Sequence, residues 1–230
     1  MNIDSLIYYP QDNTNNDIKY YHGVPAVTSS KLDPKKPLVI FYHGNACSSG
    51  QMVSMVQKLS DNYMIPEYPG YSGVGPCEEG TTVGIIRHVD ALAEWLSKNK
   101  MKVHIIGQSI GTGPACMLAD KLPRRVVSSL QLLSPFTTLS QVINDYSLFV
   151  GYLVPSYYYN NLACLKKLVA YCPINIYHGT DDTTISASHS ETIQEHIGKS
   201  SNLKLYLLEN VNHNNIWNNH VVKTISQFLD

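Results

Sequence analysis

The chain has 230 residues, of which 43% are hydrophobic and 15% are charged, and this balance excludes an intrinsically disordered protein. The formal net charge of −1 shows no excess of basic residues, so we expect no binding of nucleic acid. Five widely spaced cysteines without a CxxC pair argue against a disulfide framework or a zinc site, and we therefore expect a cytoplasmic protein of a reducing compartment.

The N-terminal segment predicts no targeting signal and one small pair of strands. MNIDSLIYYPQDN lacks a basic region followed by an apolar run, so we expect no signal peptide. The aromatic runs LIYY (6–9) and IKYYHG (18–23) favour β-structure, and the polar residues between them predict a connecting turn. The longest apolar stretch, at 148–155, is too short to span a bilayer, which leaves only a peripheral membrane contact open.

Strands and helices are expected to alternate through the rest of the chain. A run that is apolar on both faces predicts a central parallel strand at 38–44, and further strands are predicted at 102–107, 126–134, 173–179 and 203–209, with a weaker one at 63–68. Helices are predicted over 48–59, 81–98, 111–122, 186–198 and 215–230. This alternation predicts a mostly parallel sheet within a single α/β domain, 1–230. Residues 136–171 interrupt the pattern, and we expect a small cap insertion over one end of the sheet.

The most informative motif is the G-x-S-x-G sequence at Gly107–Gly111. It follows a predicted strand and opens a predicted helix, which is the setting of a nucleophile elbow. Its glycines allow the backbone to crowd around a strained serine, and the helix N-terminus favours developing negative charge. The motif therefore predicts Ser109 as a nucleophile, and the alternative is a helix-capping serine in a glycine turn.

A serine hydroxyl needs a base, and in this architecture an acid and then a histidine follow the serine along the chain. His213 and Asp182 fit that order, and both follow predicted strands. The pattern does not separate Asp182 from its neighbour Asp181. The remaining candidate histidines are expected to be structural or solvated: His178, His189, His196 and His220.

An oxyanion hole needs two backbone amides directed at the tetrahedral oxygen. One amide comes from the residue after the nucleophile, here Ile110, and the other from the loop after an earlier strand. The segment after 38–44 fits, and we favour the amide of Asn45. The alternative is that His43 and Gly44 simply form a tight turn between strand and helix.

Six motifs occur in a consistent order along the chain: FYHGNA (41–46), EYPGYSGVGPCEEG (67–80), HIIGQSIGTGPA (104–115), LLSPF (132–136), IYHGTDDTTI (176–185) and NHNNIW (212–217). Together they resemble the α/β-hydrolase family from about residue 37 to the end. Within that family the chain is similar to small serine hydrolases that include depalmitoylases and the α/β-hydrolase domain-containing proteins of type seventeen. The resemblance implies the α/β-hydrolase fold, a mostly parallel central sheet flanked by helices with a short cap insertion.

The resemblance also implies roles for individual residues. Ser109 is the implied nucleophile and His213 the base, Asp182 is chosen over Asp181, and the oxyanion amides belong to Asn45 and Ile110. Three positions depart from the family pattern, since Glu67 replaces an aspartate, Ser72 replaces a glycine, and Asn212 stands where glycine or alanine often precedes the histidine. The depalmitoylases carry an N-terminal cysteine cluster that MNIDSLIYY lacks.

The expected activity is hydrolysis of acyl esters or thioesters through an acyl-enzyme, without a metal or other cofactor. Expected substrates are an acylated small molecule, a lipid or a depalmitoylase-type acylated protein. A serine peptidase of the same fold and a non-catalytic binding protein remain the alternatives. The short cap predicts an open, shallow site, with an acyl groove or the cap's own core formed by Leu148, Phe149, Tyr152, Leu153 and Tyr157–Tyr159.

Overall fold

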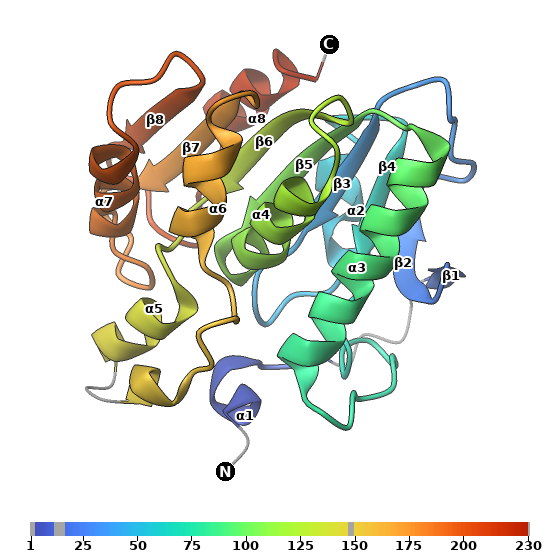
Figure 1. Cartoon of the computed structure of the whole chain (residues 1–230), viewed down its shortest axis with the longest axis horizontal. Coiled ribbons are helices and arrows are strands. Elements are labelled where there is room, and N and C mark those ends of the chain that lie inside the picture. The colour runs from blue at the N-terminus through green and yellow to red at the C-terminus, as the bar shows by residue number, and fades with distance from the viewer. Residues whose placement is uncertain (1–2, 12–16, 147–149, 230) are drawn as a thin grey trace.

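A single twisted sheet forms the centre of the protein (Figure 1). The computed structural model describes residues 3–11, 17–146 and 150–229, and eight strands within these ranges pair in the order β1-β2-β4-β3-β5-β6-β7-β8. Strands β4, β3 and β5 to β8 are parallel, whereas β1 and β2 run antiparallel at one edge. The strands are β1 Lys19–Tyr21, β2 Val24–Thr28, β3 Leu38–Tyr42, β4 Tyr63–Pro66, β5 Val103–Gln108, β6 Val127–Leu133, β7 Ile174–Gly179 and β8 Leu203–Leu208.

Helices cover both faces of the sheet, which confirms the predicted architecture. Helices α3, α4 and α6 lie over one face and α2 and α8 over the other (Figure 1), while α7 packs against α6 and β8. The α-helices are α1 Asp4–Ile7, α2 Val53–Val56, α3 Thr81–Asn99, α4 Thr112–Lys121, α5 Leu139–Tyr146, α6 Asn161–Leu168, α7 Ser188–Ile197 and α8 Asn219–Ser226. The 3₁₀ turns found in the described ranges are η1 Gly50–Met52, η2 Ser109–Gly111 and η3 Val150–Leu153.

The continuous apolar run of β3 reflects burial on both faces, whereas the edge strand β8 has only Leu203 buried. In β3, Ile40 packs into the cluster under α3 and α4, and its neighbour Phe41 packs into the opposite cluster with Val221 and Ile225 of α8. Successive side chains of a strand point to opposite faces, so a strand covered on both sides needs apolar residues throughout. Each such fully buried side chain contributes about 1.5–3 kcal/mol of transfer free energy.

The N-terminal segment differs from its prediction. LIYY does not form a strand, because Asp4–Ile7 folds into the short helix α1. The carboxylate of Asp4 accepts hydrogen bonds from the N–H and hydroxyl of Thr82, so a distant contact overrides the local β-propensity. The predicted strand pair is instead β1 with β2, joined by His22 and Gly23, which both have positive φ, as a two-residue hairpin turn requires.

The predicted cap segment, 136–171, contains two different structural parts. Helix α5 and η3 lie at the end of the molecule that also carries α1 (Figure 1). Helix α6, which begins at an Asn160 cap that accepts the Ala163 N–H, packs against α4 over the sheet. In the described part of the chain, no helix combines the length and the apolar character needed to cross a membrane.

The strand order creates a crevice at the carboxyl end of β3. The chain runs from β3 to β4 on one side and then returns to β5 on the other, so the connections after β3 and β5 diverge. Such a switch point is where open α/β sheets bind ligands. The segments that follow β3 and β5 meet there, and a Cβ added at Gly111 would collide with the carbonyl oxygen of Tyr42.

Candidate active site

Ser109 lies in a strained turn between β5 and α4. Its φ is +54°, a left-handed conformation that is unfavourable for a residue with a side chain. A Cβ at Gly107 would lie 2.7 Å from the Gly111 carbonyl oxygen and 2.8 Å from the Ala115 Cβ. Both glycines of G-x-S-x-G are therefore required by close backbone packing, and they hold the serine at the tip of the turn.

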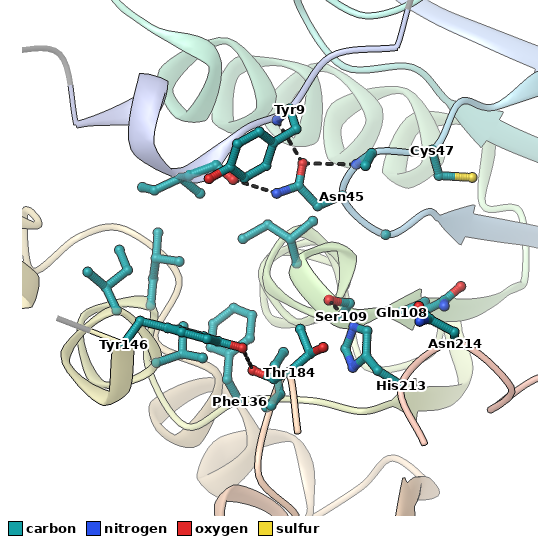
Figure 2. Close-up of a pocket in the computed structure, with 18 of the residues that line it drawn as sticks. Tyr9, Asn45, Cys47, Gln108, Ser109, Phe136, Tyr146, Thr184, His213 and Asn214 are labelled. Carbon is teal, nitrogen blue, oxygen red and sulfur yellow. Dashed lines mark hydrogen bonds between the residues drawn. The ribbon is translucent and has the colours of Figure 1, made fainter. Parts of the chain in front are cut away.

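The structure brings Ser109, His213 and Asp182 together. The Ser109 Oγ is 2.9 Å from the Nε2 of His213, and the Nδ1 of His213 is 2.7 Å from the Oδ2 of Asp182. These partners assign the tautomer, with the Nδ1–H donating to the carboxylate and Nε2 accepting from the serine hydroxyl. Figure 2 shows Ser109 beside His213 at one end of the pocket. The carboxylate that contacts His213 is therefore that of Asp182, whereas the neighbouring Asp181 is exposed.

Asp182 is held as a carboxylate by several donors. Burial acts to raise its pKa, but hydrogen bonds from His178 and His213, together with the Ile185 N–H, outweigh this effect and lower the pKa below its usual value. Its Oδ1 accepts the N–H groups of Thr184 and Ile185 at 2.9 and 2.8 Å. The side chain is fully buried, so its charge is available mainly to the adjacent histidines.

His178 lies directly behind this aspartate. It is fully buried, its Nδ1 is 2.6 Å from the Ser190 Oγ, and its Nε2 is 2.8 Å from the Ile185 carbonyl oxygen. The Nε2 also lies 3.5 Å from the Asp182 Oδ2. The sequence predicts a structural or solvated histidine, and the structure shows a structural one whose position beside the acid no local pattern signals.

The loop after β3 carries Asn45, and its side chain has a role that the sequence analysis misses. The Asn45 Oδ1 accepts the Tyr9 and Ala46 N–H groups and the Tyr71 hydroxyl, while the Nδ2 donates to the Ile7 carbonyl oxygen. One amide side chain therefore connects the N-terminal segment to this loop (Figure 2). Asn45 and Ile110 both line the pocket that contains Ser109, although their amides as oxyanion donors remain a prediction.

A buried network of polar side chains, formed by His43, Glu67 and Ser49, stabilises the loop that follows β3. The His43 Nε2 lies 2.9 Å from the Glu67 Oε1, and both side chains are fully buried. The other Glu67 oxygen accepts the Ser49 N–H and hydroxyl at 2.9 and 2.8 Å. Burial acts to raise the pKa of Glu67, but the hydrogen bonds from His43 and Ser49 lower it overall. Glu67, which replaces the family's aspartate, therefore holds the start of the loop as an ionised group.

Two further departures from the family pattern have local explanations. Ser72 has a φ of +47°, so it occupies a left-handed conformation for which glycine is the usual residue. The Asn212 Oδ1 accepts the N–H groups of Asn214 and Asn215 at 2.9 and 3.2 Å, which orders the loop that carries His213.

Ser109 and His213 open into a cavity of about 890 Å³. Its walls are mostly apolar, and none of the described residues that line it is Lys, Arg, Asp or Glu. The Trp217 Nε1 donates to the Gln108 Oε1 at 2.7 Å on the same side as His213. The cavity offers a mostly apolar wall without charged side chains beside the serine.

The predicted acyl groove is not where the sequence places it. Tyr152, Leu153 and Tyr157 are 65–78% exposed, and neither they nor the buried Tyr158 and Tyr159 line the cavity. Tyr159 packs instead against Gly113 of α4, where a Cβ would collide with its ring. Leu148 and Phe149 lie outside the described residues. The wall on this side is formed by Leu139, Val142, Ile143 and Tyr146 of α5, with Val150.

Metal ligation finds no support in the part of the chain that the structure describes. Its His, Cys, Asp and Glu side chains form no group of three that could hold an ion.

Comparison with known proteins places this geometry in context. No protein-family model matches the sequence. The chain is 28% identical to a protein of Acanthamoeba polyphaga mimivirus, provisionally named alpha/beta hydrolase L404, over 97% of this chain and 87% of that protein. It is also 28% identical to the lysophosphatidylserine lipase ABHD12 of Xenopus tropicalis, over 63% of this chain but only 42% of that lipase.

A solved structure supports the fold independently of sequence. MGS-M2, an alpha/beta hydrolase enzyme from a Medee basin deep-sea metagenome library, superposes with a TM-score of 0.66 at 15% identity, covering 93% of this chain and 95% of that one. At a sequence identity this low, the structural similarity is evidence for a shared fold and not for a shared activity. Strand order, elbow and these likenesses together establish that the chain has the α/β-hydrolase fold, and they support its membership of the α/β-hydrolase superfamily.

Proposed function

We propose that this protein is a serine hydrolase that cleaves carboxylic esters of acyl groups, with Ser109 as nucleophile, His213 as base and Asp182 as its partner. The observation that carries the proposal is the continuous hydrogen-bond chain from the Ser109 Oγ through His213 to Asp182. It ends at a strained elbow beside an apolar cavity, so nucleophile and binding space coincide.

In this mechanism the Ser109 Oγ attacks the ester carbonyl carbon while the His213 Nε2 takes the hydroxyl proton. The Asp182 carboxylate stabilises the imidazolium, and the amides of Asn45 and Ile110 donate to the oxyanion. Collapse of the tetrahedral intermediate breaks the bond to the alcohol, which takes the proton from His213. Water, deprotonated by His213, then attacks the acyl-enzyme and releases the acid and free Ser109.

Ester substrates are favoured over the alternatives by the surroundings of the serine. The cavity wall is apolar and uncharged, which suits an acyl chain better than a charged peptide terminus. The similarity to a lysophosphatidylserine lipase points in the same direction, toward lipid esters. Thioesters, including acylated proteins of the depalmitoylase type, react through the same attack on a carbonyl carbon, and we include them among the proposed substrates. A cytoplasmic location is likewise proposed.

The test is activity-based labelling with a fluorophosphonate, combined with hydrolysis of p-nitrophenyl esters, the matching thioesters and aminoacyl amides. We expect Ser109→Ala to abolish labelling and to lose nearly all hydrolysis. Ser134→Ala is the matched control, because Ser134 also follows a parallel strand, is buried and has a φ of +47°, but does not line the cavity. Labelling of Ser109→Ala at the wild-type level would refute the proposal, and faster cleavage of amides than esters would identify a peptidase instead.

A further inference from the structure

The N-terminal segment Ile3–Tyr9 forms one wall of the cavity. Leu6, Ile7 and Tyr9 line it from one side, opposite the α5 residues Val142 and Ile143. In Figure 2 the segment with Tyr9 and the helix with Tyr146 lie across the pocket from each other, with Ser109 and His213 at one end. A linear apolar group attached to Ser109 would therefore extend between these two walls.

The segment is fixed in place by buried polar contacts on the side away from the cavity. Asp4 is 4% exposed, and its carboxylate accepts the Thr82 N–H at 3.0 Å and the Thr82 hydroxyl at 2.7 Å. The hydroxyl of Tyr8, a buried residue, donates to the Tyr159 hydroxyl at 3.1 Å. These contacts are with α3 and with the chain before α6, so the wall belongs to the folded protein and is more than a loose terminus.

Asn45 joins the wall to the loop beside the nucleophile. It bonds the main chain of both Ile7 and Tyr9, and the residue before it, Gly44, lies beside Ser109, since a Cβ built at Gly44 would be 3.7 Å from the Ser109 Cβ. Asn45 therefore links the wall directly to the loop beside the reacting serine, in addition to the contacts that Asp4 and Tyr8 make. Since the lining residues on the two walls are apolar and carry no charge, the chemistry they would recognise is a hydrocarbon chain.

We propose that the segment Ile3–Tyr9 is the specificity-determining wall of an acyl-chain site, which selects esters whose acyl chain is long enough to lie between α1 and α5. This inference rests on the proposed function and deepens it. Leu6 contributes directly to the hydrophobic contact, and Asp4 contributes by holding the segment against α3.

The test compares kcat/KM for p-nitrophenyl octanoate with that for p-nitrophenyl acetate. The wild type is expected to favour octanoate, and Leu6→Asp is expected to lower the octanoate-to-acetate ratio by about tenfold, because a charge replaces part of the apolar wall. Ile143→Asp, on the opposite wall, should lower the ratio similarly. The control is Leu207→Asp on β8, a comparably exposed leucine outside the cavity, which should leave the ratio unchanged.

Two further variants keep the test decisive if a charge disturbs folding. Leu6→Ala should lower the ratio in the same direction by a smaller factor, and Asp4→Asn should lower it although Asp4 does not line the cavity. Asp120→Asn, whose carboxylate pairs with Lys167 on the outer face of α4, is the matched control. Circular dichroism confirms that each variant is folded.

The outcomes separate the two proposals. A wild type that cleaves acetate without preferring octanoate, or a folded Leu6→Asp with the wild-type ratio, overturns the acyl-wall inference and leaves the serine hydrolase intact. Absence of fluorophosphonate labelling and of all ester hydrolysis refutes the proposed function. In that case, calorimetric binding of octanoate to the wild type, weakened by Leu6→Asp, still supports the chain site, and failure to bind refutes it.

Discussion

Two clusters among the described residues join an aspartate, a histidine and a hydroxyl at almost the same distances, although the two ring nitrogens exchange roles between them and their surroundings differ. His213 bridges Asp182 and the Ser109 hydroxyl at 2.7 and 2.9 Å. His189 of α7 bridges Asp145 of α5 and the Thr137 hydroxyl at 2.8 and 3.0 Å. Each cluster is thus an acid, an imidazole and a hydroxyl in series. Distances alone do not distinguish a reactive site from a structural contact.

The differences lie in backbone and access. Thr137 also donates its own N–H to the His189 Nδ1 at 3.3 Å, so that nitrogen has a main-chain partner, whereas the His213 Nε2 faces only the Ser109 hydroxyl among the contacts of the described residues. Ser109 has a strained φ and lines the cavity, and neither Thr137 nor His189 does so. The second cluster fastens α5 to α7, and we expect it to act on stability rather than on chemistry.

The largest difference in activity between the two clusters is expected when each one loses its hydroxyl group. Ser109→Ala should lower kcat/KM for p-nitrophenyl octanoate by about 10⁴-fold or more, because no other group takes over the covalent step. Thr137→Val should change it by no more than about threefold, since small structural changes away from the reacting atoms are worth a few tenths of a kcal/mol. Steady-state kinetics on both purified variants measures this. Comparable losses in the two would show that the clusters act together.

The acids provide the next comparison. Asp182→Asn should lower kcat by about 10³–10⁴-fold, because an amide no longer favours the productive histidine tautomer or stabilises the imidazolium. Asp145→Asn makes the identical chemical change in the other cluster and should stay within about threefold of the wild type. Fluorophosphonate labelling rates provide an independent measurement. If Asp182→Asn retained wild-type kcat, Asp182 would be excluded as the acid partner of His213.

The residues of the first cluster are predictable from sequence for a topological reason. Ser109, Asp182 and His213 each follow a run that forms a parallel strand, and parallel strands bring their carboxyl ends to one edge of the sheet. The run that forms β3 is readable because burial on both faces makes it continuously apolar, whereas β8 is an edge strand with Lys204 and Leu207 exposed. The local pattern alone does not choose between Asp181 and Asp182, whereas the family resemblance favours Asp182, which is the buried residue that contacts His213 in the structure.

The cavity walls are not predictable in the same way. Helix α1 depends on a contact between Asp4 and Thr82, and Tyr8 meets Tyr159, which is 151 residues away. No local period encodes such pairs, so the aromatic run LIYY indicates a strand while tertiary contacts impose a helix. For the same reason the tyrosines at 157–159 look like groove residues in the sequence, but Tyr157 is exposed, Tyr158 is buried outside the cavity, and Tyr159 packs against Gly113 of α4.

A smaller effect, the pH dependence of the free energy of unfolding, also distinguishes Asp182 from Asp145. The lowered pKa of Asp182, set by hydrogen bonds from His178 and His213 against the opposing effect of burial, stabilises the fold above the unfolded-state value of about 3.9. This stabilisation is lost as pH falls below that value toward the folded-state pKa. Between pH 5 and pH 3 the wild type should therefore lose about 1 kcal/mol more free energy of unfolding than Asp182→Asn.

Urea unfolding at the two pH values measures this difference, with Asp145→Asn as the charge-matched reference. The pH-dependent loss in Asp182→Asn should be smaller than in the reference. An equal loss in all three proteins would mean that Asp182 is not preferentially stabilised as a carboxylate in the folded state.

The smallest effect concerns the structural cluster alone. Asp145 is 44% exposed in its side chain, so its contact with His189 is partly hydrated and screened by salt. Asp145→Asn at neutral pH should therefore lower the free energy of unfolding by only about 0.2–1 kcal/mol, and by less in 1 M salt. Urea unfolding at low and high salt measures this loss, and fluorophosphonate labelling of Ser109 should proceed at the wild-type rate. A larger, salt-independent loss accompanied by slower labelling would mean that α5 transmits the state of its histidine–aspartate contact to Ser109, and the two clusters would no longer be separable.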